Sequence, residues 1–207
     1  MLERRSALAA HPLSKAGTEL GVVPGNPPAV VVVERRPLAL LQVSAFAATV
    51  GEAGARLAGA LGLPLPGPNR CAGDPARNLR AIGPGVWQAI APEGGLPDAA
   101  ALRAALAGVA TVVDLSHARA AFRVGGPAAA RTLAKHCGLD LHPSVFPAGS
   151  ATNTRFGHLG ATLARVDAGD DPLYELLVFR GYAEYVFEAL VEGAAEFGVR
   201  IDAPVAG

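Results

Sequence analysis

Hydrophobic and polar positions in the first half of the chain follow strand and helix periods in turn. The apolar run LALLQVSA (38–45) has the length of a buried strand, and VGEAGARLAGALG (50–62) places apolar side chains at helical spacing before a glycine. Two strands around a Gly-Pro-Gly turn follow, then a helix capped by Asp98, then the strand VATVVDL. The order β-α-β-β-α-β is that of a split βαβ unit, which we place at residues 37–110.

The same order begins again in the second half. Ala118, Ala120, Phe122 and Val124 alternate with polar residues as in a strand, and GGP then places Pro127 at the first position of a helix that Gly138 ends. RFGHLGATLARVD and LYELLVF read as two strands joined by AGDDP, and YAEYVFEALVEGAAEF as a long amphipathic helix. The sequence therefore predicts an α+β fold of two tandem ferredoxin-like halves, the second with the order β-α-β-β-α over residues 111–207.

Residues 1–36 have a different character. They contain GVVPGNPPAVVVVERRP, whose prolines lack an N–H donor and favour extended neighbours. We expect an extended N-terminal arm outside the core. Four consecutive valines, Val30–Val33, would promote aggregation if they were exposed. The sequence therefore predicts that this run pairs with another strand.

Composition and charge narrow the function classes. The 207 residues include 18 basic and 18 acidic side chains, so the chain has no electrostatic footprint of a nucleic-acid binder. Cys71 and Cys137 form no C-x-x-C pair, which is typical of free thiols in a reducing compartment and favours the cytoplasm. Pro and Gly interrupt each apolar run before it could span a bilayer, and the N-terminus has no apolar signal segment. We expect a soluble protein.

Asp114, Ser116 and His117 are residue types of a hydrolase triad. A strand alternates its faces, however, so Asp114 and Ser116 would point one way and His117 the other. The sequence also has no G-x-S-x-G turn to present a nucleophile. We expect no catalytic residues here, but a strand end whose Asp or Ser accepts hydrogen bonds from nearby backbone N–H groups.

Three ligand-type side chains, His136, Cys137 and His142, lie within seven positions. A zinc site would need a fourth ligand, and Cys137 falls on the apolar face of its helix. We expect a buried structural cysteine beside solvated histidines, and no metal site.

Two further patterns carry weak signals. Gly125 and Gly126 precede a helix N-terminus, which can bind anions, but neither a dinucleotide nor a Walker motif is present, so we expect a tight turn and no cofactor.

Glutamates recur every fourth residue along the last helix, which indicates a solvated face or a surface that meets a basic partner. They are Glu184, Glu188, Glu192 and Glu196.

The run VVDLSHARAAFRVGGPAAARTLAKHCGLDLHP, followed by FGHLGATLARV and LYELLVFRGYAEYVFEAL, resembles the gamma subunit family of heterotetrameric sarcosine oxidase. The match extends over roughly residues 37–200. That family is similar to the folate-dependent aminomethyltransferases, in which "DLSH" and a following Arg-x-x-Gly-Pro open one unit of the core.

The resemblance implies a non-catalytic structural subunit of an oxidase that demethylates sarcosine to glycine. It implies FAD, FMN, NAD, tetrahydrofolate and zinc in the other subunits, and alpha, beta and delta subunits as partners, with the large alpha subunit the expected contact. No cofactor is expected in this chain, and no nucleic acid or membrane as a partner.

The chain departs from the aminomethyltransferases where those enzymes place an Asn and an acidic pair against the folate amine. Asn153 has no acidic pair after it, and Asp170 and Asp171 lie in a later turn. General-base chemistry has no evident agent. An independent folate-dependent aminomethyltransferase and a subunit of a related secondary-amine oxidase or dehydrogenase remain alternatives.

Overall fold

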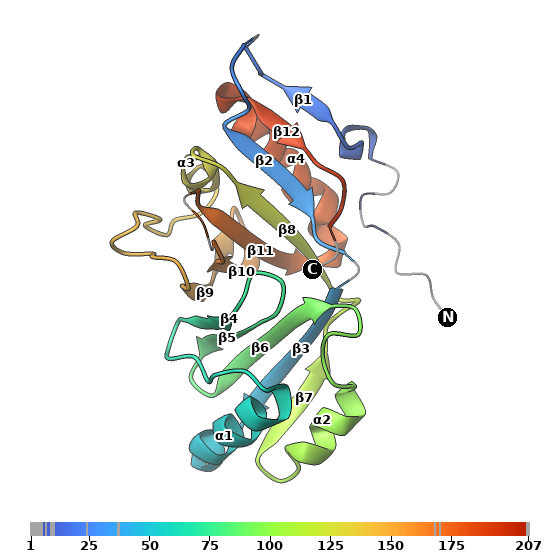
Figure 1. The fold of residues 1–207 in the computed structure, drawn as a ribbon, viewed down its shortest axis with the longest axis vertical. Helices are drawn as coiled ribbons and strands as arrows, with labels where there is room; N and C mark the ends of the chain where they lie inside the picture. Colours follow the sequence, from blue (N-terminus) through green and yellow to red (C-terminus); the bar gives the residue numbers. More distant parts are fainter. Residues whose placement is uncertain are drawn as a thin grey trace.

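The computed structural model describes residue 6, residue 8 and residues 11–23, 25–36, 38–167, 169 and 171–205. These residues form two β-sheets that lie one above the other along the long axis of the molecule (Figure 1). Helices α1 and α2 accompany the lower sheet, and α3 and α4 the upper one.

The five-stranded sheet has the order β4-β5-β6-β3-β7, and every neighbouring pair is antiparallel. Helices α1 (Val50–Leu61) and α2 (Ala99–Ala105) pack on it around a core that includes Leu57, Trp87 and Leu102. The element order β3-α1-β5-β6-α2-β7, with β6 between β3 and β5, confirms the predicted split βαβ unit. The strands are β3 (Leu38–Ala45), β4 (Cys71–Gly73), β5 (Asn78–Gly83), β6 (Val86–Pro92) and β7 (Ala110–Asp114).

The seven-stranded sheet has the order β1-β12-β2-β8-β11-β10-β9 and is antiparallel except for the pair β12·β2. Helices α3 (Ala129–Ala134) and α4 (Ala183–Ala194) cover its core. The strands are β1 (Thr18–Leu20), β2 (Val30–Glu34), β8 (Arg119–Gly125), β9 (Ala151–Phe156), β10 (Leu159–Arg165), β11 (Leu173–Phe179) and β12 (Val199–Ile201), and the 3-10 turns are η1 (Pro12–Ser14), η2 (Ala47–Thr49), η3 (Arg180–Tyr182) and η4 (Ala195–Phe197).

The valine run of the N-terminal segment is an interior strand of this sheet. β2 pairs with β8 on one side and with β12 on the other, which confirms that Val30–Val33 pairs with other strands. Val30 and Val32 are completely buried. The expectation that the whole of residues 1–36 lies outside the core is therefore wrong for β2, because it occupies the sheet position next to β8 that the last strand of a split βαβ unit would take.

Two local predictions for the second half are corrected. RFGHLGATLARVD is not one strand: Gly157, with φ of +56°, turns the chain between β9 and β10, a conformation that glycine adopts without strain. The helix after Gly126 begins at Ala129 rather than at Pro127 and ends at Ala134, before Gly138. The short strand β12 was not expected.

The two sheets are joined through β9 and its approach. An isolated bridge links Arg70 with Ser150, and the Cys71 N–H donates to the Gly149 carbonyl at 2.8 Å. Within the described residues, no helix is both long and apolar enough to cross a membrane.

Candidate functional site

A buried arginine–glutamate cluster lies between the two sheets. It consists of Arg35, Arg80, Arg123 and Glu175, contributed by the residue after β2 and by β5, β8 and β11. Arg35 Nη1 lies 2.8 Å from Glu175 Oε2, and Arg123 Nε lies 3.1 Å from the same oxygen. Arg80 donates from Nη2 to Glu175 Oε1. The side chains of Arg35, Arg80 and Glu175 have no exposed area.

The three guanidinium groups determine the ionisation of Glu175. Burial alone would raise its pKa, but the charges of Arg80, Arg35 and Arg123 outweigh burial and lower the pKa to about 2. Arginine does not release its proton in proteins. The cluster therefore holds fixed charges at neutral pH and offers neither a general acid nor a general base.

The arginines of the cluster also bind the loop that precedes β5. Arg35 donates to the carbonyl of Ala76, and Arg123 donates to the carbonyl of Pro75. Arg80 Nε donates to Asn78 Oδ1 at 2.8 Å. The bonds of Arg35 and Arg123 to this loop, with the ion pair of Arg80 and Glu175, fix one sheet to the other, so the cluster is a structural site. The sequence prediction missed it, although the lone Glu in the apolar run LYELLVF indicated a buried charge in need of a partner.

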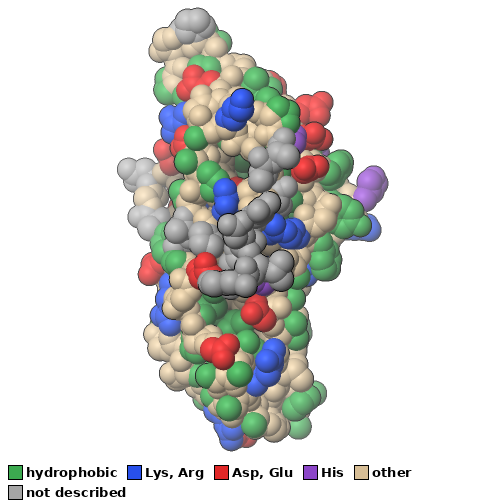
Figure 2. Space-filling model, turned by 90° about the vertical axis from the view of Figure 1, so that its right-hand side faces the viewer, with side chains coloured by type: hydrophobic (Ala, Val, Ile, Leu, Met, Phe, Trp, Pro, Cys, Tyr) green, Lys and Arg blue, Asp and Glu red, His purple; other side chains and the backbone are tan. Residues whose placement is uncertain are grey.

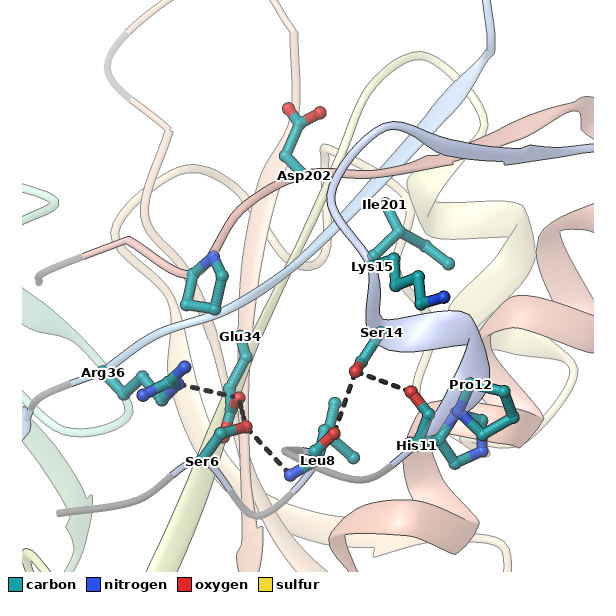
Figure 3. Close-up of a pocket in the computed structure, with 11 residues that line it drawn as sticks. Ser6, Leu8, His11, Pro12, Ser14, Lys15, Glu34, Arg36, Ile201 and Asp202 are labelled. Atoms are coloured by element: carbon teal, nitrogen blue, oxygen red, sulfur yellow. Dashed lines mark hydrogen bonds and ion pairs between the residues drawn. The ribbon is translucent and has the colours of Figure 1, made fainter. Parts of the chain in front are cut away.

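A pocket of about 420 Å³ lies between the N-terminal segment, β2 and the chain after β12 (Figure 3). Its serine, histidine and acidic side chains already have partners. Ser14 Oγ lies 2.9 Å from the carbonyl oxygen of Leu8 and 2.8 Å from that of His11, and can donate to either. His11 Nε2 lies 3.1 Å from Glu188 Oε1. Ser6 Oγ donates to Glu34, which also lies 3.2 Å from Arg36 Nε. The lining thus presents no serine hydroxyl paired with a histidine base.

An apolar groove of about 720 Å³ lies on the five-stranded half, between Ala45, Val50, Leu65, Pro84 and Trp87. No charged side chain is among its described lining residues. Flavin and nicotinamide cofactors carry phosphates, which proteins bind with cationic groups or helix N-termini. The described lining therefore offers no cationic side chain to the phosphates of such a cofactor, and the N-terminus of α1 at Val50 is its one feature of a phosphate site.

Asp114, Ser116 and His117 are not brought together for catalysis. Asp114 Oδ1 accepts from the Ser116 N–H at 2.9 Å, and Ser116 Oγ accepts from the Leu40 N–H at 3.0 Å. Ser116 is buried, whereas His117 is exposed in the turn before β8. The prediction that Asp and Ser satisfy backbone donors at a strand end is confirmed.

His136, Cys137 and His142 lie in separate surroundings. Cys137 is 6% exposed and its Sγ lies 3.5 Å from Thr154 Oγ1. The His136 ring packs on Phe156 with centroids 4.9 Å apart, and the exposed His142 contacts its own loop. The described residues contain no group of three or more metal-ligating side chains. Burial raises the pKa of the other thiol, that of Cys71.

The glycine turn before α3 is closed by the protein's own backbone. Gly126 has φ of +105°, and a Cβ built on it would lie 2.5 Å from the Ala29 carbonyl oxygen. That oxygen accepts from the Ala128 N–H at 3.1 Å. The predicted tight turn is confirmed. The Ala128 N–H is not free to bind an anion, because it donates to the Ala29 carbonyl.

The four glutamates of the last helical segment are exposed, as a solvated face requires. Glu188 pairs with His11 and Glu196 with Lys135, both within this chain. On the face that Figure 2 draws, acidic and basic side chains are interspersed.

Asn153 has a structural role. Its Nδ2 donates to the Ile82 carbonyl at 3.2 Å, and its Oδ1 accepts from Thr162 Oγ1 at 2.9 Å. Asn153 thereby links β9 to β5 of the other sheet. Asp171 is exposed beyond β10, and Asp170 lies outside the described residues.

Two solved structures share this architecture. A chain of the heterotetrameric sarcosine oxidase from Corynebacterium sp. U-96 matches 94% of this chain and 96% of its own length with a TM-score of 0.77 and 27% identity. The glycine cleavage system aminomethyltransferase T from Bartonella henselae matches 95% of this chain and 50% of its own length, with a TM-score of 0.62 and 17% identity. The second match shows a shared fold alone.

The chain is thus an α+β protein with the fold seen in aminomethyltransferase T, and its central polar residues hold its two halves together. The family model for the sarcosine oxidase gamma subunit matches residues 43–196. The chain is 38% identical to the sarcosine oxidase gamma subunit of Arthrobacter sp. over 156 residues, which are 72% of this chain and 74% of the relative. It is 36% identical to that of Corynebacterium sp. (strain P-1) over 117 residues, 56% of each chain. The chain belongs to the sarcosine oxidase gamma subunit family.

Proposed function

We propose that this chain is the non-catalytic gamma subunit of a flavin-dependent heterotetrameric sarcosine oxidase. The observation that carries the proposal is the central arginine–glutamate cluster. In this aminomethyltransferase-like fold, the buried charged residues between the two sheets form ion pairs with one another and join the sheets. Neither this cluster nor the triad-type residues provide a proton-transfer pair. The chain contributes a folded body to an enzyme whose chemistry takes place elsewhere.

In this proposal the complex oxidatively demethylates sarcosine to glycine. FAD, FMN, NAD, tetrahydrofolate and zinc belong to the alpha, beta and delta subunits, and the large alpha subunit is the main contact. The uncharged lining of the apolar groove supports the absence of a flavin or dinucleotide from this chain. The two cysteines without a disulfide support a cytoplasmic location.

The test is co-expression of this chain with the other three subunits, with an affinity tag on the alpha subunit. We expect the chain to be recovered in equal stoichiometry from a complex that shows a flavin absorption spectrum and consumes oxygen with sarcosine. The isolated chain is expected to show no flavin absorption and no tetrahydrofolate binding in equilibrium dialysis. Recovery of the active complex without this chain would overturn the proposed role. Stoichiometric tetrahydrofolate binding by the isolated chain would favour a folate-dependent enzyme instead.

A further inference from the structure

Three exposed aromatic residues follow one another where β11 passes into α4. Phe179 and Tyr182 are each 50% exposed and Tyr185 is 49% exposed. Phe179 ends β11, Tyr182 ends η3, and Tyr185 lies in the first turn of α4, so the three follow one another at spacings of three residues. Tyr182 and Tyr185 are three residues apart where η3 passes into α4, which puts their side chains on one side of the helical turn, and Phe179 precedes them at the end of the strand. Large aromatic residues are enriched at protein–protein interfaces.

Arg119 extends this surface. It is opposite Phe179 in the pairing of β8 with β11, and its guanidinium carbon lies 3.6 Å from the centroid of the Phe179 ring. The Arg119 Nε is buried and has no hydrogen-bond partner among the described residues. Burial also lowers the pKa of Arg119. A buried guanidinium N–H without an acceptor is costly, and a carboxylate is the acceptor that it binds best.

A small cavity lies beside Arg119. Its volume is about 20 Å³, which is room for one water-sized group such as a single carboxylate oxygen. Four arginines and one glutamate line it: Arg35, Arg36, Arg119, Arg180 and Glu34. Glu34 lies 3.2 Å from Arg36, and Arg35 is bound to Glu175. Among the described residues that line the cavity, arginines therefore outnumber carboxylates, and the buried Arg119 Nε has no acceptor among them.

We propose that Phe179, Tyr182, Tyr185 and Arg119, which we name the Phe179 patch, bind a segment of another oxidase subunit in which a carboxylate lies beside apolar side chains. The aromatic rings bury the apolar part, and the carboxylate accepts from Arg119. The excess of arginines among the described lining residues and the unpaired Nε select an acidic partner over a neutral one. This inference rests on the proposed function, since it requires a partner subunit.

The test uses the co-expressed four-subunit complex. A variant chain and the wild-type chain are expressed together at equal levels, and mass spectrometry measures their ratio in the complex recovered through the alpha subunit. We expect Arg119→Gln and Tyr182→Ala each to lower the variant's share about tenfold or more. Arg119→Glu should lower it further, because it places like charges at the contact. Arg56→Gln removes an exposed arginine on α1 and should enter in equal share.

Circular dichroism of each isolated variant checks that it folds. Folded Arg119 and Tyr182 variants that enter in the same share as Arg56→Gln would overturn the patch as an interface, while the proposed function stands. An equal loss for Arg119→Gln and Arg119→Glu would overturn the carboxylate partner. A wild-type chain that dimerises alone, and becomes monomeric with Arg119→Gln, would assign the patch to a second copy instead. A wild-type chain absent from the complex would refute the proposed function.

Discussion

Arg80 of the five-stranded sheet and Glu175 of the seven-stranded sheet form an ion pair in which neither side chain is exposed to solvent. Replacing one member of such a pair leaves the remaining charges buried without compensation. We expect Glu175→Gln to lower the free energy of unfolding by about 3–5 kcal/mol. Urea unfolding at neutral pH measures the loss. Glu52→Gln, which removes an exposed carboxylate on α1, should change stability by less than about 0.5 kcal/mol.

Glu175 also makes the free energy of unfolding depend on pH. Its pKa is about 2 in the folded chain against the ordinary value of 4.5 that applies in the unfolded chain, so the folded state binds fewer protons. This contribution is complete above about pH 4.5 and is lost as the pH falls toward about 2. Glu175→Gln should lose less of its remaining stability than the wild type over that range. Equal acid dependence of the two proteins in urea unfolding would contradict this account.

Ser116→Ala removes the acceptor of the Leu40 N–H in the first strand of the five-stranded sheet. A buried donor without a partner costs about 1–3 kcal/mol, and thermal unfolding should show a loss of this size. Sarcosine turnover by the assembled oxidase should stay unchanged. His117→Ala is the control on the adjacent exposed residue, with a smaller loss of stability. A large fall in turnover at unchanged assembly would give Ser116 a catalytic role.

Gly126→Ala is expected to destabilise the protein strongly. The new Cβ would meet the Ala29 carbonyl, and φ of +105° disfavours any residue with a side chain. We expect a loss of at least about 1–3 kcal/mol. Gly160→Ala on β10 is the matched control, since a Cβ there meets nothing within 4 Å. Similar melting temperatures for the two variants would show that the close approach to Ala29 is unimportant.

Residues 1–29 and the strand β2 differ in how much they contribute to the stability of the seven-stranded sheet. Deleting residues 1–29 removes the edge strand β1, the buried Leu8 and the partly buried core residues Leu13, Leu20 and Ala29, and leaves β2 in place. Deleting residues 1–36 also removes β2 from between β12 and β8. We expect the shorter deletion to give a less stable but folded chain with weaker incorporation into the oxidase, and the longer one to unfold the seven-stranded sheet.

Circular dichroism melting and recovery with the tagged alpha subunit measure both effects. A cooperative, wild-type-like melt after deletion of residues 1–36 would show that β2 is dispensable. Undiminished incorporation after deletion of residues 1–29 would show that this segment does not contribute to the partner contact.

Much of the fold could be predicted because local patterns determine it. The strand LALLQVSA, the helix that ends at Gly62 and the α4 region each carry their own periodicity, and the structure confirms them. The turn at Gly157 was missed although the apolar alternation changes phase there, between Phe156 and the series Leu159, Ala161 and Leu163. The place of β2 was missed because the neighbour of a strand is decided by residues far along the chain, here those of β8 and β12.

The sequence prediction missed the central site, to which only one local signal points. Glu175 alone within an apolar strand indicated a buried partner, but nothing local distinguishes Arg80 or Arg35 from the many solvated arginines. Their meeting depends on how two sheets pack, which no short stretch of sequence encodes. The structural roles of Ser116 and Cys137 were predicted from their residue types and apolar surroundings, although Ser116 lies in the turn after β7 and Cys137 lies beyond the end of α3.

The pairing of β2 with β12 bears on synthesis of the chain. Residues 38–114 supply every strand of the five-stranded sheet, so that sheet can form while the ribosome is still adding later residues. β2, made earlier, must wait until Val199–Ile201 has emerged before both of its edges are paired. A nascent or prematurely terminated chain therefore carries an uncovered valine strand, and this is the stage at which a chaperone would protect it from association.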